Sequence, residues 1–360
     1  MKRPLRTILI AAALGVYALL LAEVCVRVLD PQPLMPRYVT GTPWGVRGNI
    51  PGAHYRHKTR EVNVAYRINS QGLRADREFP EHPVAGLCRV GMIGDSYFVG
   101  YEVELEDTVA SQLEKALQAR GVPSEVLNFS VSGFGTAEML RTYQGQVRKF
   151  SPDVMVMQWH VTDLDDNVRS GLYLLDGDGL RRGAETFLPS IAVQDKLMRW
   201  RLYRLLADNS QFYSFVREWL ATLVKNLLVG VRAEPAAPSS QSVAVTPDAG
   251  REELLSARLL RESMKTITSD GVGFLVVDIP EPKDRLLLKS VWTKLPVSEI
   301  QDVPVLHAAD AFKPLLSADT QLFYEKGHFH LTPLASRTLA ASIADRIAPL
   351  LLQGRCSERH

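Results

Sequence analysis

Short apolar runs alternate with amphipathic helical patterns along most of the chain. Five runs have the length and composition of buried strands. They cover residues 90–93, 125–130, 154–159, 273–278 and 303–306. Apolar positions at helical spacing fill residues 109–120, 137–150 and 251–269, and again the stretch that follows Pro333. Because strand and helix alternate at the spacing of βαβ units, we predict a mostly parallel sheet with helices on both faces.

The regular pattern weakens in the middle of the chain. Regular spacing is lost from residue 165 to about 190, and residues 193–230 are then helical in pattern and rich in aromatic side chains. Residues 233–250 are rich in Ala, Pro and Ser and predict a flexible stretch. We interpret residues 170–250 as an insertion in the sheet domain. The sequence leaves open whether it acts as a lid, packs on the sheet or lies on a membrane.

An apolar segment near the N-terminus predicts a membrane anchor. Residues 7–22 carry no charge, and with flanking basic side chains reaching the interface, residues 5–28 can cross a bilayer. A cleaved signal peptide is the alternative. No small-x-small cleavage site follows the run, and Cys25 lacks the small preceding residues of a lipoprotein signal. The pattern therefore favours an uncleaved anchor.

The charges around this segment predict its orientation. Basic residues precede it, namely Lys2, Arg3 and Arg6. By the positive-inside rule they place the N-terminus in the cytoplasm and everything after Asp30 outside it, in the periplasmic or extracytoplasmic space. Residues 31–60 are rich in proline and glycine and indicate an irregular juxtamembrane segment before a short strand at 62–68. We therefore expect an anchor over 1–30 and one large domain over 31–360.

Composition narrows the function classes. The 360 residues are 46% hydrophobic and 23% charged with a formal net charge of +2, which is ordinary for a globular protein. No basic stripe indicates a nucleic-acid partner. The three cysteines, Cys25, Cys88 and Cys356, form neither a disulfide framework nor a metal-ligand spacing. A single Cys88–Cys356 bridge is the conceivable pairing.

The run at 90–93 ends in Gly94-Asp95-Ser96, where candidate chemistry begins. Gly94 allows a sharp turn that leaves the Ser96 hydroxyl at the carboxyl end of a strand, where open α/β sheets bind ligands. Ser96 is thus a candidate nucleophile, whereas the alternative is that Asp95 or Ser96 only caps a helix. A nucleophilic serine needs a base. Among eight histidines, those near predicted strand ends or in the loop opening the last helix are His160, His328 and His330.

Three blocks together resemble the SGNH, or GDSL-type, serine esterase family. Gly94-Asp95-Ser96 is similar to its nucleophile block. Residues 128–136 resemble the second block, which implies an oxyanion-binding amide at Gly133, and residues 330–335 resemble the last block, which implies that His330 is the general base. The resemblance covers about residues 62–180 and 251–350. It implies a flavodoxin-like three-layer α/β/α sandwich, and the anchor, with Glu23 and Arg27 at its outer end, resembles a membrane-anchored bacterial branch.

Two positions depart from the family pattern. Where the family has an asparagine before an aspartate as second oxyanion donor, this chain has Thr162, whose hydroxyl could donate, with Asn167 nearby as a substitute. Where the family has an aspartate three residues before the histidine, this chain has Gly327. Glu325 is the close carboxylate. Either a bulge brings Glu325 to His330, or His328 is the base in a Glu-x-x-His arrangement, or the site is a Ser–His dyad; the residues that follow favour His330, with Glu325 as its orienter.

These motifs predict an envelope-facing, membrane-anchored serine hydrolase that needs neither a metal nor another cofactor. The resemblance implies acyl esters of carbohydrates or lipids as substrates, with Ser96 and His330 carrying the chemistry. The departures at Thr162 and Gly327 support an alternative, a catalytically impaired relative that binds a glycan or a partner in envelope polysaccharide modification. A third reading is an O-acyltransferase partner that acts on a secreted polymer.

Overall fold

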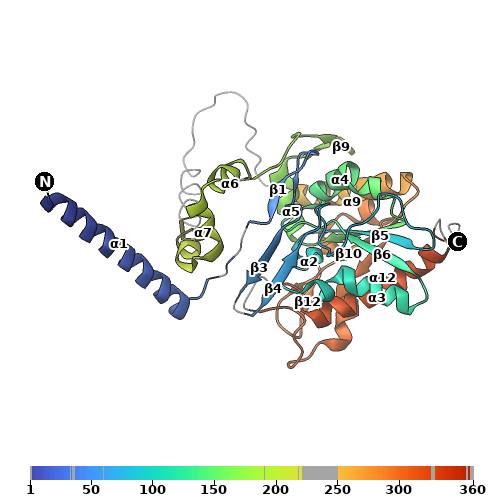
Figure 1. The fold of residues 1–360 in the computed structure, drawn as a ribbon. Helices are drawn as coiled ribbons and strands as arrows, with labels where there is room; N and C mark the ends of the chain where they lie inside the picture. The colour runs from blue at the N-terminus through green and yellow to red at the C-terminus, as the bar shows by residue number, and fades with distance from the viewer. Residues whose placement is uncertain are drawn as a thin grey trace. The chain divides into compact units, whose positions relative to one another are not determined.

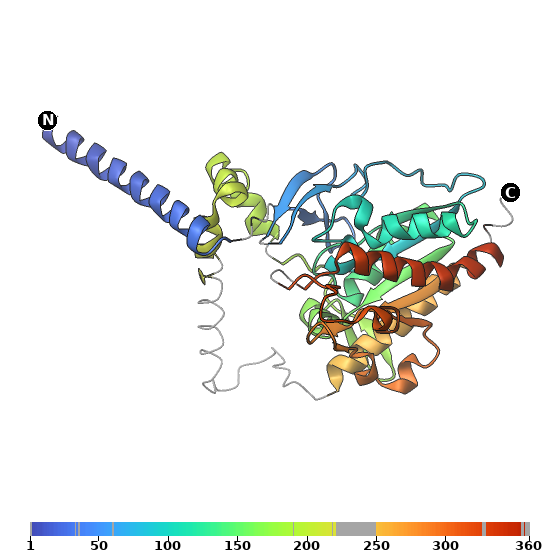
Figure 2. The same cartoon turned by 90° about the horizontal axis from the view of Figure 1, so that it is seen from below.

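The computed structural model describes residues 2–32, 34, 37–59, 61–189, 191–217, 219–220, 250–325, 329–353 and 356. The chain divides into two compact units. The sheet unit comprises Tyr38–Tyr55, Val64–Ala192 and Val245–His360, and the N-terminal unit comprises Met1–Arg37, Arg56–Asn63 and Val193–Ala244. Each unit is described by itself (Figures 1 and 2).

Five parallel strands form the centre of the sheet unit. They are β5 (Cys88–Ile93), β6 (Ser124–Asn128), β7 (Val154–Trp159), β10 (Gly273–Asp278) and β13 (Val305–His307), in the order β13-β10-β7-β5-β6. Every residue of β5, β6 and β7 is buried, as expected for parallel strands covered on both faces. The predicted parallel sheet is confirmed, and each of the five apolar runs contributes a strand.

Helices cover both faces of this sheet (Figure 1). The helices α3 (Val109–Ala119) and α12 (Pro333–Gln353) share one hydrophobic cluster with Val154 and Val156 of β7. On the opposite face, α4 (Thr136–Gly145), α5 (Thr162–Ser170) and α9 (Arg251–Ser269) share the other cluster with Met155 and Met157. Alternate residues of one strand therefore point to opposite faces. The predicted three-layer α/β/α architecture is confirmed.

The remaining elements are short. Further strands form separate two-stranded sheets: β1 (Val39–Gly41) with β2 (Arg47–Asn49), β3 (His54–Lys58) with β4 (Asn63–Arg67), β8 (Tyr173–Asp176) with β9 (Gly179–Arg182), and β11 (Glu281–Pro282) with β12 (Leu288–Lys289). The short helices are α2 (Ser96–Val99), α10 (Val297–Ile300) and α11 (Ala308–Phe312). Single 3-10 turns are η1 (Leu105–Asp107), η2 (Val147–Phe150), η3 (Trp292–Lys294) and η4 (Lys313–Leu315).

The loss of regular spacing predicted from residue 165 to 190 is wrong. Helix α5 runs to Ser170, and β8 and β9 then form an antiparallel hairpin that belongs to the sheet unit. The strands of this hairpin are too short for alternation to stand out. Gly171 supplies the positive φ angle at the end of α5, and Gly177 supplies the one in the hairpin turn. The part of the expected insertion that leaves the sheet unit therefore starts near Val193. The predicted flexible stretch at 233–249 lies outside the described residues.

The N-terminal unit contains the predicted apolar helix. Helix α1 (Lys2–Leu29) includes a stretch, Arg6–Leu29, that is long and apolar enough to cross a membrane, and no part of its most apolar window is buried in the structure. The same unit holds most of α6 (Ile191–Leu197), α7 (Arg201–Asn209) and a further helical segment that starts at Gln211 and is described through residue 217 and at 219–220. The helical pattern predicted from residue 193 is thus confirmed where the structure describes it.

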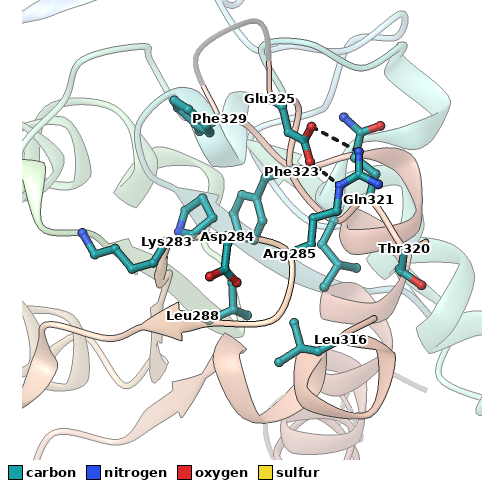
Figure 3. A pocket seen from close by; sticks show the side chains of 12 residues that line it. Lys283, Asp284, Arg285, Leu288, Leu316, Thr320, Gln321, Phe323, Glu325 and Phe329 are labelled. Carbon is teal, nitrogen blue, oxygen red and sulfur yellow. Dashed lines mark hydrogen bonds and ion pairs between the residues drawn. The ribbon is translucent and has the colours of Figure 1, made fainter. Parts of the chain in front are cut away.

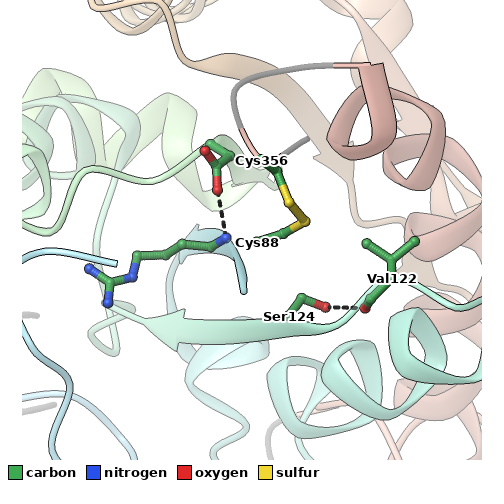
Figure 4. Close-up of a disulfide and its surroundings, with 6 residues drawn as sticks. Cys88, Val122, Ser124 and Cys356 are labelled. Atoms are coloured by element: carbon green, nitrogen blue, oxygen red, sulfur yellow. Dashed lines mark hydrogen bonds between the residues drawn. A yellow bond between two sulfur atoms is a disulfide. The ribbon is translucent and has the colours of Figure 1, made fainter. Parts of the chain in front are cut away.

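A disulfide joins Cys88 at the start of β5 to Cys356 in the C-terminal tail (Figure 4). Their Cα atoms lie 5.1 Å apart across a sequence separation of 268 residues. The bridge fastens the chain end beyond α12 to a central strand. Cys25 on α1 is a free, exposed thiol.

Candidate active site

The turn between β5 and α2 presents Ser96. The Asp95 carboxylate accepts a hydrogen bond from the Tyr97 amide at 2.8 Å, so the helix cap is Asp95 and the Ser96 hydroxyl remains available for another partner. The buried side chain of Gln158 holds the turn, because its Oε1 accepts from the amides of Asp95 at 3.1 Å and Phe98 at 3.2 Å. A Cβ atom at Gly94 would lie 2.5 Å from that oxygen, so the close approach requires glycine.

Three side chains from distant parts of the sequence form a continuous hydrogen-bonded chain. Ser96 Oγ lies 2.8 Å from His330 Nε2, and His330 Nδ1 lies 2.9 Å from Glu102 Oε2. Because a carboxylate only accepts, Nδ1 carries a proton and Nε2 is the acceptor for the Ser96 hydroxyl. The side chain of Glu102 is fully buried and that of His330 is 7% exposed. This is the arrangement that nucleophile, base and orienting acid adopt in serine hydrolases.

A buried arginine holds the loop that carries Glu102. Helix α2 ends at Gly100, whose φ of 72° turns the chain back toward the histidine. The Arg74 guanidinium donates to the carbonyls of Val99, at 2.6 Å, and of Gly100 and Val103. It also lies 3.9 Å from the ring centroid of Tyr66. Carbonyls and an aromatic face thus replace water around this buried cation and fix the loop on both sides of Glu102.

Aromatic rings and backbone contacts fix His330. The rings of Tyr97 and Tyr101 each lie 5.2 Å from the imidazole, centroid to centroid. Burial raises the pKa of both tyrosine hydroxyls, so these side chains stay neutral. The His330 carbonyl accepts from the Tyr324 amide at 2.9 Å. The preceding residue, Phe329, has a φ of 58°, an uncommon left-handed conformation for a bulky side chain.

The carboxylate on His330 is not the one that the sequence predicted. Glu325 is 42% exposed and forms an ion pair with Arg285. The expectation that Glu325 orients His330 is therefore corrected to Glu102. The predicted choice of His330 over His328 agrees with the contact to Ser96, while His328 and Gly327 lie outside the described residues.

Gly133 lies in the loop after β6, beside the nucleophile turn. The Phe129 amide donates to Met92 at 2.8 Å and the Val131 amide to Gly94 at 3.1 Å, so the loop continues the strand pairing past the end of β5. Gly133 has a φ of 78°, and its carbonyl accepts from Arg47. Among the described residues, no hydrogen-bond acceptor is assigned to the amides of Gly133 and Ser96. These two amides are available as oxyanion donors.

The two candidate replacements for the missing asparagine are both engaged elsewhere. The Thr162 amide donates to His160 Nδ1 at 3.4 Å, and the Thr162 hydroxyl lies 3.0 Å from the same nitrogen. Asn167 donates to Ser256 at 3.0 Å and accepts from the Ala137 amide at 2.9 Å, so it joins α4, α5 and α9. Asn167 is therefore a packing residue, contrary to its expected role as a substitute donor. Burial lowers the pKa of His160, which keeps its imidazole neutral.

Sequence reasoning missed Glu102, Gln158 and Arg74. Glu102 begins a run of alternating acidic residues before a helix, which indicates a solvated helix start rather than a buried acid. Its position six residues after Ser96 was the available signal, because a four-residue helix followed by glycine returns the chain toward the serine. Gln158 stands inside an apolar strand, where a lone polar residue points to a buried hydrogen-bond requirement.

A cavity of about 310 Å³ lies beside the loop that carries His330 (Figure 3). Its lining combines apolar side chains, including Leu288, Phe323 and Phe329, with the Arg285–Glu325 ion pair. Phe329 is half exposed, so an aromatic face is open next to the residue that contacts Ser96. The cavity therefore offers both a stacking surface and charged hydrogen-bonding groups.

No family model and no curated protein matches this chain. Solved structures are similar to it. They include a putative lipolytic protein of the G-D-S-L family from Desulfitobacterium hafniense, with 12% identity over 72% of this chain and 98% of that chain and a TM-score of 0.37. An acetyl xylan esterase is 11% identical over 72% of this chain and 99% of that chain, with a TM-score of 0.40. The lipase/acylhydrolase from Enterococcus faecalis is 13% identical over 73% of this chain and 96% of that chain, with a TM-score of 0.36.

Proposed function

We propose that this chain is a membrane-anchored serine esterase that cleaves O-acyl esters outside the cytoplasm. The observation that carries the proposal is the hydrogen-bonded chain from Ser96 through His330 to Glu102. With Glu102 the site has a nucleophile, a base and an acid. Glu102 takes the role of the missing aspartate, and this removes one reason for interpreting the site as catalytically impaired. The absence of the family asparagine at Thr162 remains the reason for the alternative of a non-catalytic binder.

The geometry supports a two-step acyl transfer. Ser96 Oγ attacks the ester carbonyl while His330 Nε2 takes the hydroxyl proton, and the resulting imidazolium is stabilised through Nδ1 by Glu102. The amides of Gly133 and Ser96 hold the oxyanion. His330 then gives its proton to the leaving alcohol, and an acyl-serine remains. Water, deprotonated by the same histidine, attacks the acyl carbonyl. The histidine returns this proton to Ser96 Oγ as the bond between Oγ and the acyl carbon breaks, which releases the carboxylic acid and free Ser96.

Two features support the proposed substrate and location. The cavity beside His330 joins the ring of Phe329 to the charged pair Arg285–Glu325, a combination suited to the alcohol portion of a carbohydrate ester more than to a long acyl chain. The disulfide between Cys88 and Cys356 is typical of proteins in an oxidising compartment. Together with the basic residues before the apolar helix, it supports a catalytic domain on the periplasmic or other extracytoplasmic side.

The test is hydrolysis of p-nitrophenyl acetate by the full chain in detergent micelles, with fluorophosphonate labelling as a second readout. Ser96→Ala is expected to abolish labelling and to reduce turnover to background. Ser290→Ala is the matched control. Ser290 belongs to a second cluster of a serine, an acid and a histidine, but its hydroxyl donates to the carboxylate of Asp278 and has no histidine as its partner. Equal turnover in the wild type and Ser96→Ala would refute the esterase and favour the binding protein.

A further inference from the structure

Two charged residues near the end of α1, Glu23 and Arg27, bind a turn of the helical insertion. The Glu23 carboxylate accepts from the Gln211 amide at 2.9 Å, the Phe212 amide at 2.9 Å and the Ser210 hydroxyl at 2.7 Å. One helical turn further along, Arg27 donates to the Asn209 carbonyl at 2.7 Å and to Glu23 at 2.6 Å. Four residues of the insertion are thus held by two residues of the apolar helix.

This contact matches the charges of two helix ends. Asn209 ends α7, where unpaired carbonyls attract a cation, and Gln211 begins the next helical segment, where unpaired amides attract an anion. Arg27 faces the first end and Glu23 the second. The arrangement also satisfies the Glu23 carboxylate fully, which is the condition for keeping an acidic residue within an apolar span.

The position of this contact along α1 fixes its depth. At a rise of 1.5 Å per residue, Glu23 lies about 25 Å and Arg27 about 31 Å beyond Arg6. The hydrocarbon core of a bilayer is about 30 Å thick. With Arg6 at the inner interface, the turn at 209–212 therefore lies at the outer interface. The two helices that meet there are held at the level of the outer leaflet.

Both helices expose apolar and aromatic side chains at this level. Trp200 is 71% exposed at the start of α7, and Trp219 is 57% exposed on the following helical segment. Leu202 and Leu205 on α7 and Leu220 are also exposed. Exposed arginines alternate with them, namely Arg199, Arg201 and Arg204. Tryptophan and arginine beside aliphatic side chains are the composition of segments that lie in a membrane interface.

A groove between these helices and α1 is lined by apolar side chains. It measures about 450 Å³, and its lining includes Leu19 and Leu20 of α1, Leu205 of α7, and Phe212 and Val216 of the following segment. The groove opens on the side of a helix whose apolar surface is otherwise uncovered in the described structure. At this depth, its natural occupant is a lipid acyl chain.

We propose that residues 193–220 form an interfacial membrane module that lies in the outer leaflet and is locked to the transmembrane helix by Glu23 and Arg27. The occupant of its exposed apolar face is lipid. The proposal rests on the proposed membrane anchor and is independent of the esterase activity. Of the three readings that the sequence left open for this insertion, the exposed tryptophans favour the one in which it lies on a membrane.

The test uses the full chain reconstituted into phosphatidylcholine–phosphatidylglycerol vesicles, with and without phosphatidylcholine brominated on its acyl chains as a fluorescence quencher. Trp200 and Trp219 are two of the five tryptophans, so we expect a loss of roughly two fifths of the emission if the five emit equally. The double variant Trp200→Phe, Trp219→Phe is expected to lose this quenching. Both side chains are exposed, so the substitutions leave packing intact.

Flotation of the vesicles after a carbonate wash separates the two proposals. Protein that floats with wild-type quenching no larger than that of the double variant would overturn the module and leave the anchor standing. Protein that fails to float would overturn both. Absent quenching together with cross-linking between copies through Leu202→Cys, in a Cys25→Ser background, would assign the face to a second copy of the chain and overturn the lipid assignment.

Discussion

Glu102 is the residue whose replacement tests the site most directly. In Glu102→Gln the buried carboxylate becomes an amide of the same shape, which can donate to His330 Nδ1 and so stabilise the tautomer with its proton on Nε2. That tautomer cannot accept the Ser96 proton. In the wild type, the imidazolium formed during attack lies beside a fully buried carboxylate, with Nδ1 and Oε2 2.9 Å apart. Two unit charges about 4 Å apart at an effective dielectric constant near 20 interact by about 4 kcal/mol.

This energy corresponds to roughly a thousandfold in rate, at about 1.4 kcal/mol per factor of ten. Adding the tautomer effect, we expect kcat for p-nitrophenyl acetate to fall about 10³–10⁴-fold in Glu102→Gln. Glu325→Gln is the control, because Glu325 contacts Arg285 instead, and it is expected to change kcat by less than about threefold. Circular dichroism and urea unfolding check that both variants fold.

A loss below tenfold in folded Glu102→Gln, or an equal loss in Glu325→Gln, would contradict the orienting role of Glu102. The first outcome would indicate a Ser–His dyad. The second would return the orienting role to the carboxylate that the sequence favoured.

Three further predictions concern stability and pH. Gly94→Ala would place a Cβ atom 2.5 Å from Gln158 Oε1, so we expect about 1–3 kcal/mol of destabilisation in urea unfolding and at least about tenfold lower esterase activity; an unchanged midpoint would show that the turn relaxes. Burial raises the pKa of Asp163 well above its ordinary value of 3.8, so its contribution to stability is present below about pH 4 and is lost as the pH rises toward the raised pKa. Asp163→Asn is therefore expected to flatten the fall of the urea midpoint between pH 4 and 9, and identical slopes in both proteins would contradict this. Cys356→Ser removes a cross-link that spans 268 residues of sequence and is expected to lower the free energy of unfolding by about 2–5 kcal/mol without changing kcat. Reduction of the wild type with dithiothreitol is expected to have the same effect. An unchanged urea midpoint would show that the bridge does not form.

Much of the fold followed from the sequence because apolar periodicity reports burial directly. The run at 273–278 corresponds residue for residue to β10, and the helical pattern at 251–269 to α9. The hairpin of β8 and β9 was missed, since each strand has four residues, β8 is buried only at Tyr173, β9 is mostly exposed, and neither shows strong alternation. Periodicity is informative only where a face is consistently buried.

The site was predictable where a motif lies at a strand end and not where a contact depends on the path of a loop. Ser96 follows β5 and His330 lies in the loop that opens α12, so each could be inferred from a local motif and its place in the order of elements. Glu102 reaches His330 only because α2 ends after one turn, Gly100 adopts a positive φ and Arg74 fastens the loop. Each of these conditions is set by packing, which a single sequence does not display.

The sequence by itself determined the layered α/β architecture, the long apolar helix near the N-terminus, and the pairing of a serine after one strand with a histidine before the last helix. Each is encoded in local patterns whose physical cause, burial or turn geometry, acts over a few residues. Only the tertiary structure decided which carboxylate hydrogen-bonds His330, that Asn167 is a packing residue, and that Glu23 and Arg27 hydrogen-bond the insertion. Those outcomes depend on which side chains, distant in sequence, share one desolvated space, because a buried charge must find its partner there.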